Sequence, residues 1–206
     1  PGAAGQVGTE LVARQKNDGY TLLINATGHV IGPAVNDKVR YNPIKDFAPI
    51  GILARAPNLV VVNAGVPVKT VSEFLAWGKA QPGVPYGSAG FGGSTHLGGE
   101  WLKKITGVPM EHVPYKGASP ATNAVVSGEL KVAVQDAMSV APFIKSGQLR
   151  PIGVASAQRS KLFPDLPTFA ESGAPGLDVY TWLGFYAPAG TDPAIVAKLN
   201  QATNDI

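Results

Sequence analysis

The residues best suited to chemistry lie in a glycine-rich loop, Tyr86–Leu97, with the sequence YGSAGFGGSTHL. Its glycines allow tight turns and a close approach of the backbone to a ligand. Its hydroxyl side chains lie beside the expected start of a helix, where the first N–H groups have no partner within the helix. The stretch therefore predicts an anion-binding loop that could serve catalysis, nucleotide binding or capture of a small carboxylate.

Catalysis and nucleotide binding are both poorly supported by the sequence of this loop. Ser94 and His96 invite comparison with a serine hydrolase, but the G-x-S-x-G motif is absent and two residues on one helix cannot adopt the usual nucleophile–base geometry. Ser94 is predicted to be the helix N-cap instead. The phosphate-loop motif is absent and the dinucleotide motif lacks its last glycine. A serine hydrolase remains the enzymatic alternative.

Metal and thiol chemistry are also disfavoured. The chain contains no cysteine, and its histidines, His29, His96 and His112, lie far apart and form no zinc-binding motif. We therefore expect no metal site and no cofactor. His29 follows a predicted strand and is interpreted as a capping or packing residue.

Composition indicates a folded α/β protein with one large or two small domains. The 206 residues are 45% hydrophobic and 15% charged, and 25 glycines and 18 prolines punctuate the whole length. The net charge of +3 is spread out without a basic run, which argues against a nucleic-acid partner. No apolar run reaches the length of a membrane span, so direct membrane insertion is not expected.

Alternating strands and helices position the loop. The predicted strands of this part of the chain are 84–87, 110–114, 130–134 and 149–155, with helices between them. This rhythm predicts a parallel sheet whose exit loops, beginning at Ser88, Tyr115 and Asp136, share one edge. Ser119 and Pro120 are predicted to be the N-cap and first residue of one of the helices.

The flanking segments give further predictions. A helix is expected over 5–16, a strand over 20–24 with an exit loop at 25–29, and a strand buried on both faces over 59–62. Capping-box patterns begin at Thr70 and Thr168. A last strand over 177–187 precedes a helix that begins at Asp192.

Seven segments, taken together, resemble the periplasmic solute receptors of tripartite tricarboxylate transporters, the Bug-type family. Singly each is weak, but they follow the family's order along essentially the whole chain. They are Pro1–Gly5, Asp18–Leu23, Tyr41–Ile50, Tyr86–His96, His112–Gly117, Pro164–Thr168 and Ala187–Thr191.

The resemblance implies an α/β fold in the form of a two-domain, periplasmic-binding-protein-like clamshell with three-layer lobes. The first domain would combine residues 1–62 and 181–206, and the second would be 63–180, with strands near 59–62 and 180–187 crossing between them as a hinge. The family pattern extends beyond both ends of this sequence, so the first lobe is expected to be truncated at both chain ends. We therefore expect this chain to bind its ligand weakly or not at all.

The function implied by the resemblance is extracytoplasmic capture of a small organic anion in an interdomain cleft, without catalysis, for delivery to a membrane permease. The location would be the periplasm. An orphan or sensory binding module of the same fold is the non-enzymatic alternative. Domain closure on the ligand is the expected working motion.

Backbone N–H groups and hydroxyls are expected to hold the carboxylate without a paired arginine. Asp136 would suit a ligand with an amino or hydroxyl group or a water-mediated contact, and is equally well interpreted as a helix cap. Lys116 either adds charge to the site or is simply solvated. Trp77 and Trp101 are expected in the core. The predicted ligand-binding residues are Thr27, Ser88, Ala89, Gly90, Gly92, Ser94, Thr95, Tyr115, Lys116, Gly117 and Asp136.

Overall fold

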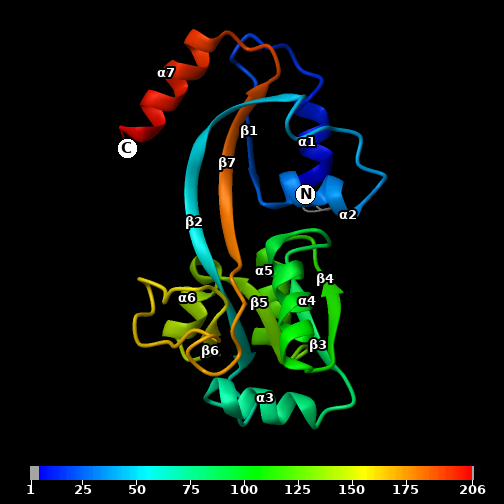
Figure 1. Ribbon diagram of the computed structural model, residues 1–206, viewed down its shortest axis with the longest axis vertical. Helices are drawn as coiled ribbons and strands as arrows, with labels where there is room; N and C mark the ends of the chain where they lie inside the picture. The colour runs from blue at the N-terminus through cyan, green and yellow to red at the C-terminus, as the bar shows by residue number, and fades with distance from the viewer. Residues whose placement is uncertain (1–4, 206) are drawn as a thin grey trace. The chain divides into compact units, whose positions relative to one another are not determined.

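The computed structural model describes residues 5–205, and the chain divides into two units (Figure 1). The first unit is Pro1–Arg55 with Trp182–Ile206, and the second is Ala56–Thr181. Two strands, β2 (Phe47–Asn63) and β7 (Tyr180–Pro188), contain residues of both units. The first boundary follows Arg55, whereas the sequence analysis placed it after Val62, because Leu59–Val62 pairs within the sheet of the second unit.

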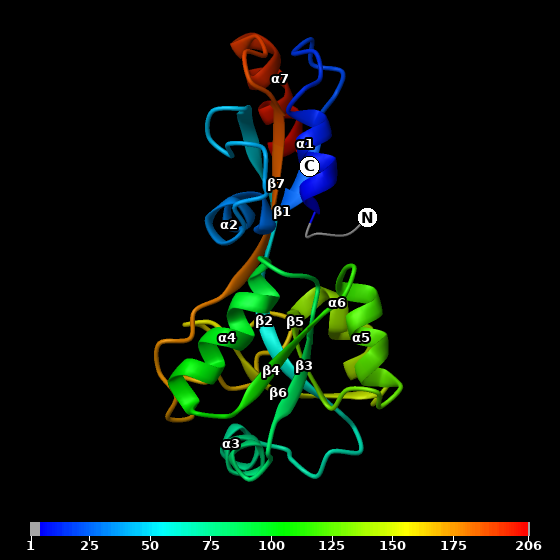
Figure 2. The same cartoon turned by 90° about the vertical axis from the view of Figure 1, so that its right-hand side faces the viewer.

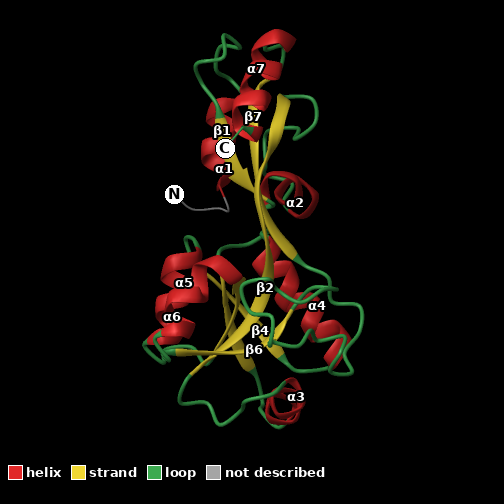
Figure 3. Cartoon of the chain, turned by 90° about the vertical axis from the view of Figure 1, so that its left-hand side faces the viewer, coloured by secondary structure: helices red, strands yellow, loops and turns green. Residues whose placement is uncertain are grey.

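The second unit is a mixed sheet covered by helices on both faces. Its remaining elements are α3 (Val71–Lys79), β3 (Val84–Ser88), α4 (Ser94–Thr106), β4 (Met110–Pro114), α5 (Ala118–Val126), β5 (Val132–Asp136), α6 (Ala137–Lys145) and β6 (Leu149–Val154). Helix α4 covers one face of the sheet, while α5 and α6 cover the other (Figures 2 and 3). The α/β prediction is confirmed for this unit.

The prediction of an all-parallel sheet is wrong in one respect. Strand β3 is parallel to β4 and β5, as expected. However, β2 is antiparallel to both β5 and β6, and so separates these two strands. The prediction was based on strands that are joined to one another by helices. It did not include β2, whose first residues belong to the first unit.

Alternate residues of β2 pack on opposite faces of the sheet, which explains its unbroken run of apolar side chains. Val60 and Val62 join the core beneath α4, together with Tyr86 and Leu102. On the other face, Leu59 and Val61 pack against α5 and α6. All four β2 residues have no exposed surface. The prediction of a strand buried on both faces is therefore confirmed.

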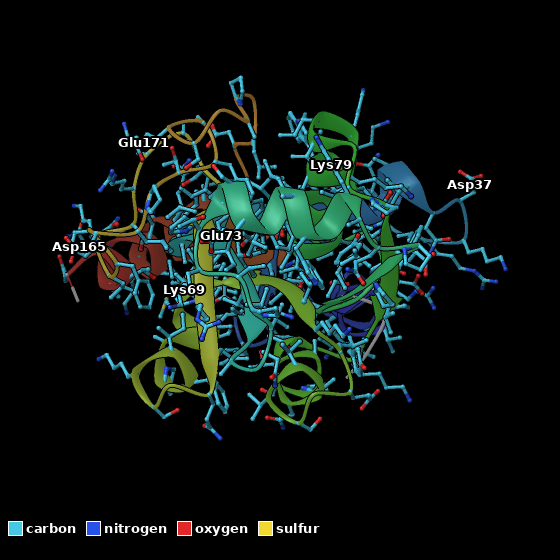
Figure 4. All side chains as sticks on the ribbon, turned by 90° about the horizontal axis from the view of Figure 1, so that it is seen from below. Asp37, Lys69, Glu73, Lys79, Asp165 and Glu171 are labelled. Carbon is cyan, nitrogen blue, oxygen red and sulfur yellow. The ribbon has the colours of Figure 1, made fainter. Side chains whose placement is uncertain are left out.

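Helix α3 shows how local sequence signals fix an element. Thr70 caps its first turn by accepting a hydrogen bond from the Glu73 N–H, and the Glu73 carboxylate accepts hydrogen bonds from the N–H groups of Thr70 and Lys69. Glu73 lies at the start of the helix beside Lys69, and Lys79 lies in its last turn (Figure 4). The predicted capping box is confirmed. Thr168 and Glu171 make the same reciprocal bonds, but a turn follows instead of a helix.

Within residues 5–205, the first unit contains three helices and strand β1, which lies beside β7, and β7 in turn neighbours β2. Its own elements are α1 (Gln6–Val12), β1 (Leu23–Ala26), α2 (Gly28–Val35) and α7 (Pro193–Asn204). β1 pairs with β7 in a register that joins Leu23 to Tyr186. The predicted exit loop 25–29 is wrong in part, because α2 begins at Gly28.

His29 belongs to the core of this unit. Its ring has no exposed surface and lies 4.3 Å from the Tyr186 ring centroid and 4.7 Å from that of Phe47. Tyr41 stacks on it at 5.5 Å. Its interpretation as a packing residue is confirmed. Burial lowers the pKa of His29, and the backbone carbonyl of Pro43 partly offsets this effect.

Candidate functional site

The glycine-rich loop connects β3 to α4, as predicted, but the N-cap of α4 is one residue earlier than predicted. Gly93 is the N-cap of α4 and Ser94 is its first residue, so the prediction of Ser94 as the cap is wrong. Gly90 and Gly92 have φ angles of 136° and 77°. These conformations favour glycine, because a side chain would be strained there. Two of the predicted site residues are therefore required by the shape of the loop itself.

Several backbone N–H groups of the loop are bound by the protein's own side chains. The Ala89 N–H donates to Thr95 Oγ1 at 3.0 Å, and the Gly90 N–H donates to Ser88 Oγ at 3.2 Å. The Gly92 N–H donates to the Nδ1 atom of His96 at 3.3 Å. These groups stabilise the loop and have less capacity for a ligand than the sequence suggested.

The donors that remain are at the first turn of α4. The first hydrogen bond of the helix backbone is donated by the Leu97 N–H to the Gly93 carbonyl at 3.0 Å. The N–H groups of Thr95 and His96 precede it, and neither has a protein acceptor among residues 5–205. Both residues are largely buried, so these dipoles lie in a partly desolvated setting where they favour a negative charge. This turn is the strongest anion-binding feature of the loop.

Two histidines, His96 and His112, form a close ring pair beside the loop, with their centroids 4.0 Å apart and their planes tilted by 33°. His112, from β4, bonds Ser88 Oγ through Nε2 at 2.6 Å, and the ring centroid of Phe91 lies 4.7 Å from that of His96. Burial lowers the pKa of His112 to about 4, with a further lowering by His96 and a smaller opposing effect from Glu100. Burial also lowers the pKa of His96, again opposed by Glu100. Both rings are therefore neutral near pH 7.

The loop between β4 and α5 is joined directly to the glycine-rich loop. The N–H of Tyr115 donates to the Ser88 carbonyl and the N–H of Gly117 donates to the Ala89 carbonyl, each at 3.1 Å. The structure thus brings these predicted site residues together, although the two N–H groups are used in doing so. The Tyr115 hydroxyl donates to Glu129 at 2.9 Å, and Lys116 is exposed.

Gly117, with a φ of 121°, is the N-cap of α5. Ser119 and Pro120 therefore lie inside the helix, and the prediction of Ser119 as its cap is wrong. A proline is tolerated in the first turn of a helix, because the backbone N–H groups there have no acceptor within the helix. The sequence pattern consequently did not fix the start of this helix to a single residue.

Asp136 ends β5 and caps α6. Its carboxylate accepts hydrogen bonds from the N–H of Ser139 at 2.9 Å and from the Ser139 hydroxyl at 2.6 Å. Of the two interpretations left open by the sequence, the helix cap is thus confirmed, and a contact with a ligand stays a prediction. Because β5 is parallel to β3, Asp136 lies at the same edge of the sheet as Ser88.

Thr27 belongs to the first unit, where it is the N-cap of α2 and is 4% exposed. Its side chain makes no cap hydrogen bond. Its predicted role opposite the loops of the second unit stays a prediction.

Two connections made by the loop were not predicted from the sequence. His112 was not assigned to the site, although it follows from the pairing of two predicted strands, in which Tyr86 lies beside His112. Ser94 Oγ contacts Thr181 Oγ1 at 2.7 Å, and Thr181 donates to Asn58 Oδ1 at 2.8 Å. No local pattern marks Asn58 or Thr181, because both contacts span much of the sequence.

The arrangement does not support nucleophilic catalysis. Ser88 and His112 have the spacing of a nucleophile and a base, yet Ser88 has no exposed surface, and Ser94 is only 4% exposed. Within residues 5–205 no group of three or more acidic or histidine side chains is placed to hold a metal ion. In the same range no helix is long and apolar enough to cross a membrane.

Comparison with known proteins gives a consistent result. The family model described as the tripartite tricarboxylate transporter family receptor matches residues 1–206. BugT of Bordetella pertussis is 32% identical over 99% of this chain and 64% of its own length. The chain spans between 61% and 64% of the length of the first three curated relatives that it matches.

Two solved structures of similar proteins contain dicarboxylates. Rpa4515 of R. palustris, determined with adipate, is 33% identical with a TM-score of 0.93, and the match covers 97% of this chain and 67% of that one. MatC from Rhodopseudomonas palustris, determined with bound malate, is 32% identical with a TM-score of 0.91, and the match covers 99% of this chain and 70% of that one.

Proposed function

Since the chain belongs to the tripartite tricarboxylate transporter receptor family, we propose that it captures a small organic anion and performs no catalysis. The ligand is a carboxylate, held where the strands of the second unit end. The proposal extends to a periplasmic location and to delivery of the ligand to a membrane permease. The malate and adipate found in the two neighbours support carboxylates as the ligand class.

The observation that carries the proposal is the first turn of α4. The N–H groups of Thr95 and His96 have no acceptor within the described chain and point from the positive end of a 13-residue helix. A carboxylate oxygen placed there gains charge-assisted hydrogen bonds without a paired cation. Exposed Lys116 on the neighbouring loop adds positive potential but is not needed as a direct contact.

Two glycines that flank α4 offer a matched test of this assignment. Gly92, in the loop before the helix, has a φ of 77°, and Gly107, the C-cap, has a φ of 73°. Changing either one to alanine places a side chain in the left-handed region at a similar cost of about 1–2 kcal/mol. Only Gly92→Ala, however, disturbs the end of the helix that binds the anion. Gly107→Ala is therefore the control for loss of stability.

The experiment is an NMR titration of the ¹⁵N-labelled chain with adipate, which detects affinities as weak as millimolar. We expect saturable shifts of the amides between Ala89 and Leu97, weakened in Gly92→Ala and unchanged in Gly107→Ala. Adipamide, which has the same carbon skeleton without charge, should cause none of these shifts. Equal binding by the two variants, equal response to adipamide, or no saturable shift with either adipate or malate would contradict the proposal.

A further inference from the structure

The histidine pair beside the glycine-rich loop has a role that packing alone does not explain. The centroids of its two tilted rings are 4.0 Å apart, and each ring bonds a different part of the loop. His96 Nδ1 accepts from the Gly92 N–H, and His112 Nε2 bonds Ser88 Oγ. Two basic groups, one from α4 and one from β4, thus contact the loop that is proposed to receive an anion.

We propose that His96 and His112 make anion capture a proton-coupled event, in which a carboxylate at the first turn of α4 draws one proton onto the pair. The inference rests on the proposed function and identifies the proton as a second ligand of that same site. The proton binds at a ring nitrogen of the pair and is released again when the anion leaves.

The charged and titratable groups around the histidine pair explain why a bound anion would favour its protonation. The titratable groups that act on it are Tyr86 from β3 and Glu100 from α4, in addition to the histidines themselves. The Tyr86 hydroxyl lies 3.1 Å from Glu100 Oε1, and burial together with Glu100 keeps it protonated. Glu100 acts electrostatically on both histidines as a negative group, and a negative group so placed repels an incoming carboxylate. One proton on the pair cancels that charge.

The hydrogen bonds of the loop accommodate the proton. His96 accepts through Nδ1, so its proton resides on Nε2, and protonation of Nδ1 would release the Gly92 N–H. The released N–H and the new N–H are both donors at the start of α4. On the other ring, a proton on His112 Nε2 donates to Ser88 Oγ, and the Ser88 hydroxyl can turn to the Gly90 carbonyl at 3.4 Å. Protonation of His112 opposes no two donors, whereas a proton on His96 Nδ1 faces the Gly92 N–H, which must then turn to the bound anion.

Thermodynamic linkage between proton binding and anion binding determines how the affinity for a carboxylate changes with pH. The free pair has depressed pKa values, and a bound anion raises them, because it stabilises the protonated form. The affinity for a carboxylate therefore increases as pH falls through the interval between the bound and free values. Since one proton is taken up, the increase is at most about tenfold per pH unit.

The test follows the imidazole resonances of the three histidines between about pH 4 and 7.5, which includes the depressed pKa of free His112, and affinities are compared above about pH 5.5, where carboxylates stay largely ionised. The titration is recorded without ligand, with adipate and with adipamide. We expect adipate to raise the pKa of His96 or His112 by at least about half a unit, a shift well within the range that a nearby charge produces. His29, which lies in the core of the first unit, is the internal control and should not respond.

Glutamine variants separate proton binding from packing. In His96→Gln a side-chain oxygen can still accept from Gly92, and in His112→Gln the amide can still bond Ser88, but neither replacement titrates. We expect the affinity for adipate of the double variant to be independent of pH over this range, whereas that of the unaltered chain rises at lower pH.

The outcomes distinguish the two proposals. Saturable loop shifts with unchanged imidazole titration would overturn the proton coupling and leave the receptor function standing. A double variant with the full pH dependence would do the same. Absence of any saturable loop shift would overturn the proposed function and the coupling together.

Discussion

The close packing of α4 on Tyr86 gives the sharpest prediction for stability, since it fixes the helix whose first turn is the proposed anion site. A Cβ atom added to Gly99 would lie 2.1 Å from Cε2 and 2.2 Å from Cζ of Tyr86. Ordinary contacts begin at 3.4 Å. The Tyr86 ring cannot retreat easily, because it is fully buried and its hydroxyl donates towards the His96 carbonyl at 3.0 Å.

We therefore expect Gly99→Ala to destabilise the second unit. Overpacking of this kind costs about 3 kcal/mol at the upper end of the usual range. Alanine returns about 1 kcal/mol through its higher helix propensity. The net loss is about 2 kcal/mol, which corresponds to a fall of about 1 M in the urea midpoint for a typical slope. Residue-resolved NMR of urea unfolding reports the second unit separately from the first.

Gly8 is the matched control, because it also lies within a helix but has no atom within 4 Å of an added Cβ. Gly8→Ala should stabilise α1 by up to about 1 kcal/mol. Combining Gly99→Ala with Tyr86→Leu, which removes the obstructing ring, should cost at least about 1 kcal/mol less than the sum of the two single changes. The reasoning is refuted if Gly99→Ala leaves the midpoint unchanged, or if the two effects are additive.

Three further predictions concern caps and charge. Thr70→Ala should lower the free energy of unfolding of the second unit by about 1 kcal/mol through loss of the α3 cap, and no change in the urea midpoint would contradict this. Asp136→Ala should cost a similar amount and Asp136→Asn much less, because asparagine also caps helices; equal losses in thermal unfolding would mean that its charge matters more than its cap. The stability of the first unit should fall as pH is lowered from about 6.5 towards the depressed pKa of folded His29, by at most about 1.4 kcal/mol per pH unit, because the unfolded chain binds the proton more readily. His29→Leu should remove that pH dependence of the urea midpoint, and a variant that retains it would show that other groups cause it.

Features encoded by neighbouring residues could be predicted from the sequence. The Thr70 capping box depends on two side chains three residues apart, and the bounds of β4, Met110–Pro114, agree with the predicted strand. The family resemblance, which rests on motifs along the whole chain, supplied the arrangement into two units. The cap and the strand could be predicted because each depends only on residues close to it in the sequence.

Helix α2 was missed because its sequence disfavours a helix locally. Gly28, Gly32 and Pro33 all lower helix propensity. The structure explains Gly32, since a Cβ there would lie 2.9 Å from the Gln6 side chain of α1. Packing between α1 and α2 thus requires glycine at this position, although glycine has a low helix propensity.

The candidate site also combines features that could be predicted from the sequence with features that could not. The position of the glycine-rich loop between a strand and a helix followed from its composition, but the partners of its N–H groups did not. The bond between Ser88 and His112 depends on the pairing of β3 with β4, and the link from Ser94 through Thr181 to Asn58 depends on the path of β2 and β7. Such contacts are fixed by tertiary structure, which a single sequence does not specify residue by residue.

The most direct test of carboxylate capture is a crystal structure of the chain grown with adipate. We predict a carboxylate oxygen within hydrogen-bond distance, about 2.7–3.2 Å, of the N–H groups of Thr95 and His96. Adipate bound elsewhere in the second unit, with this turn occupied only by water, would contradict the assignment of the site.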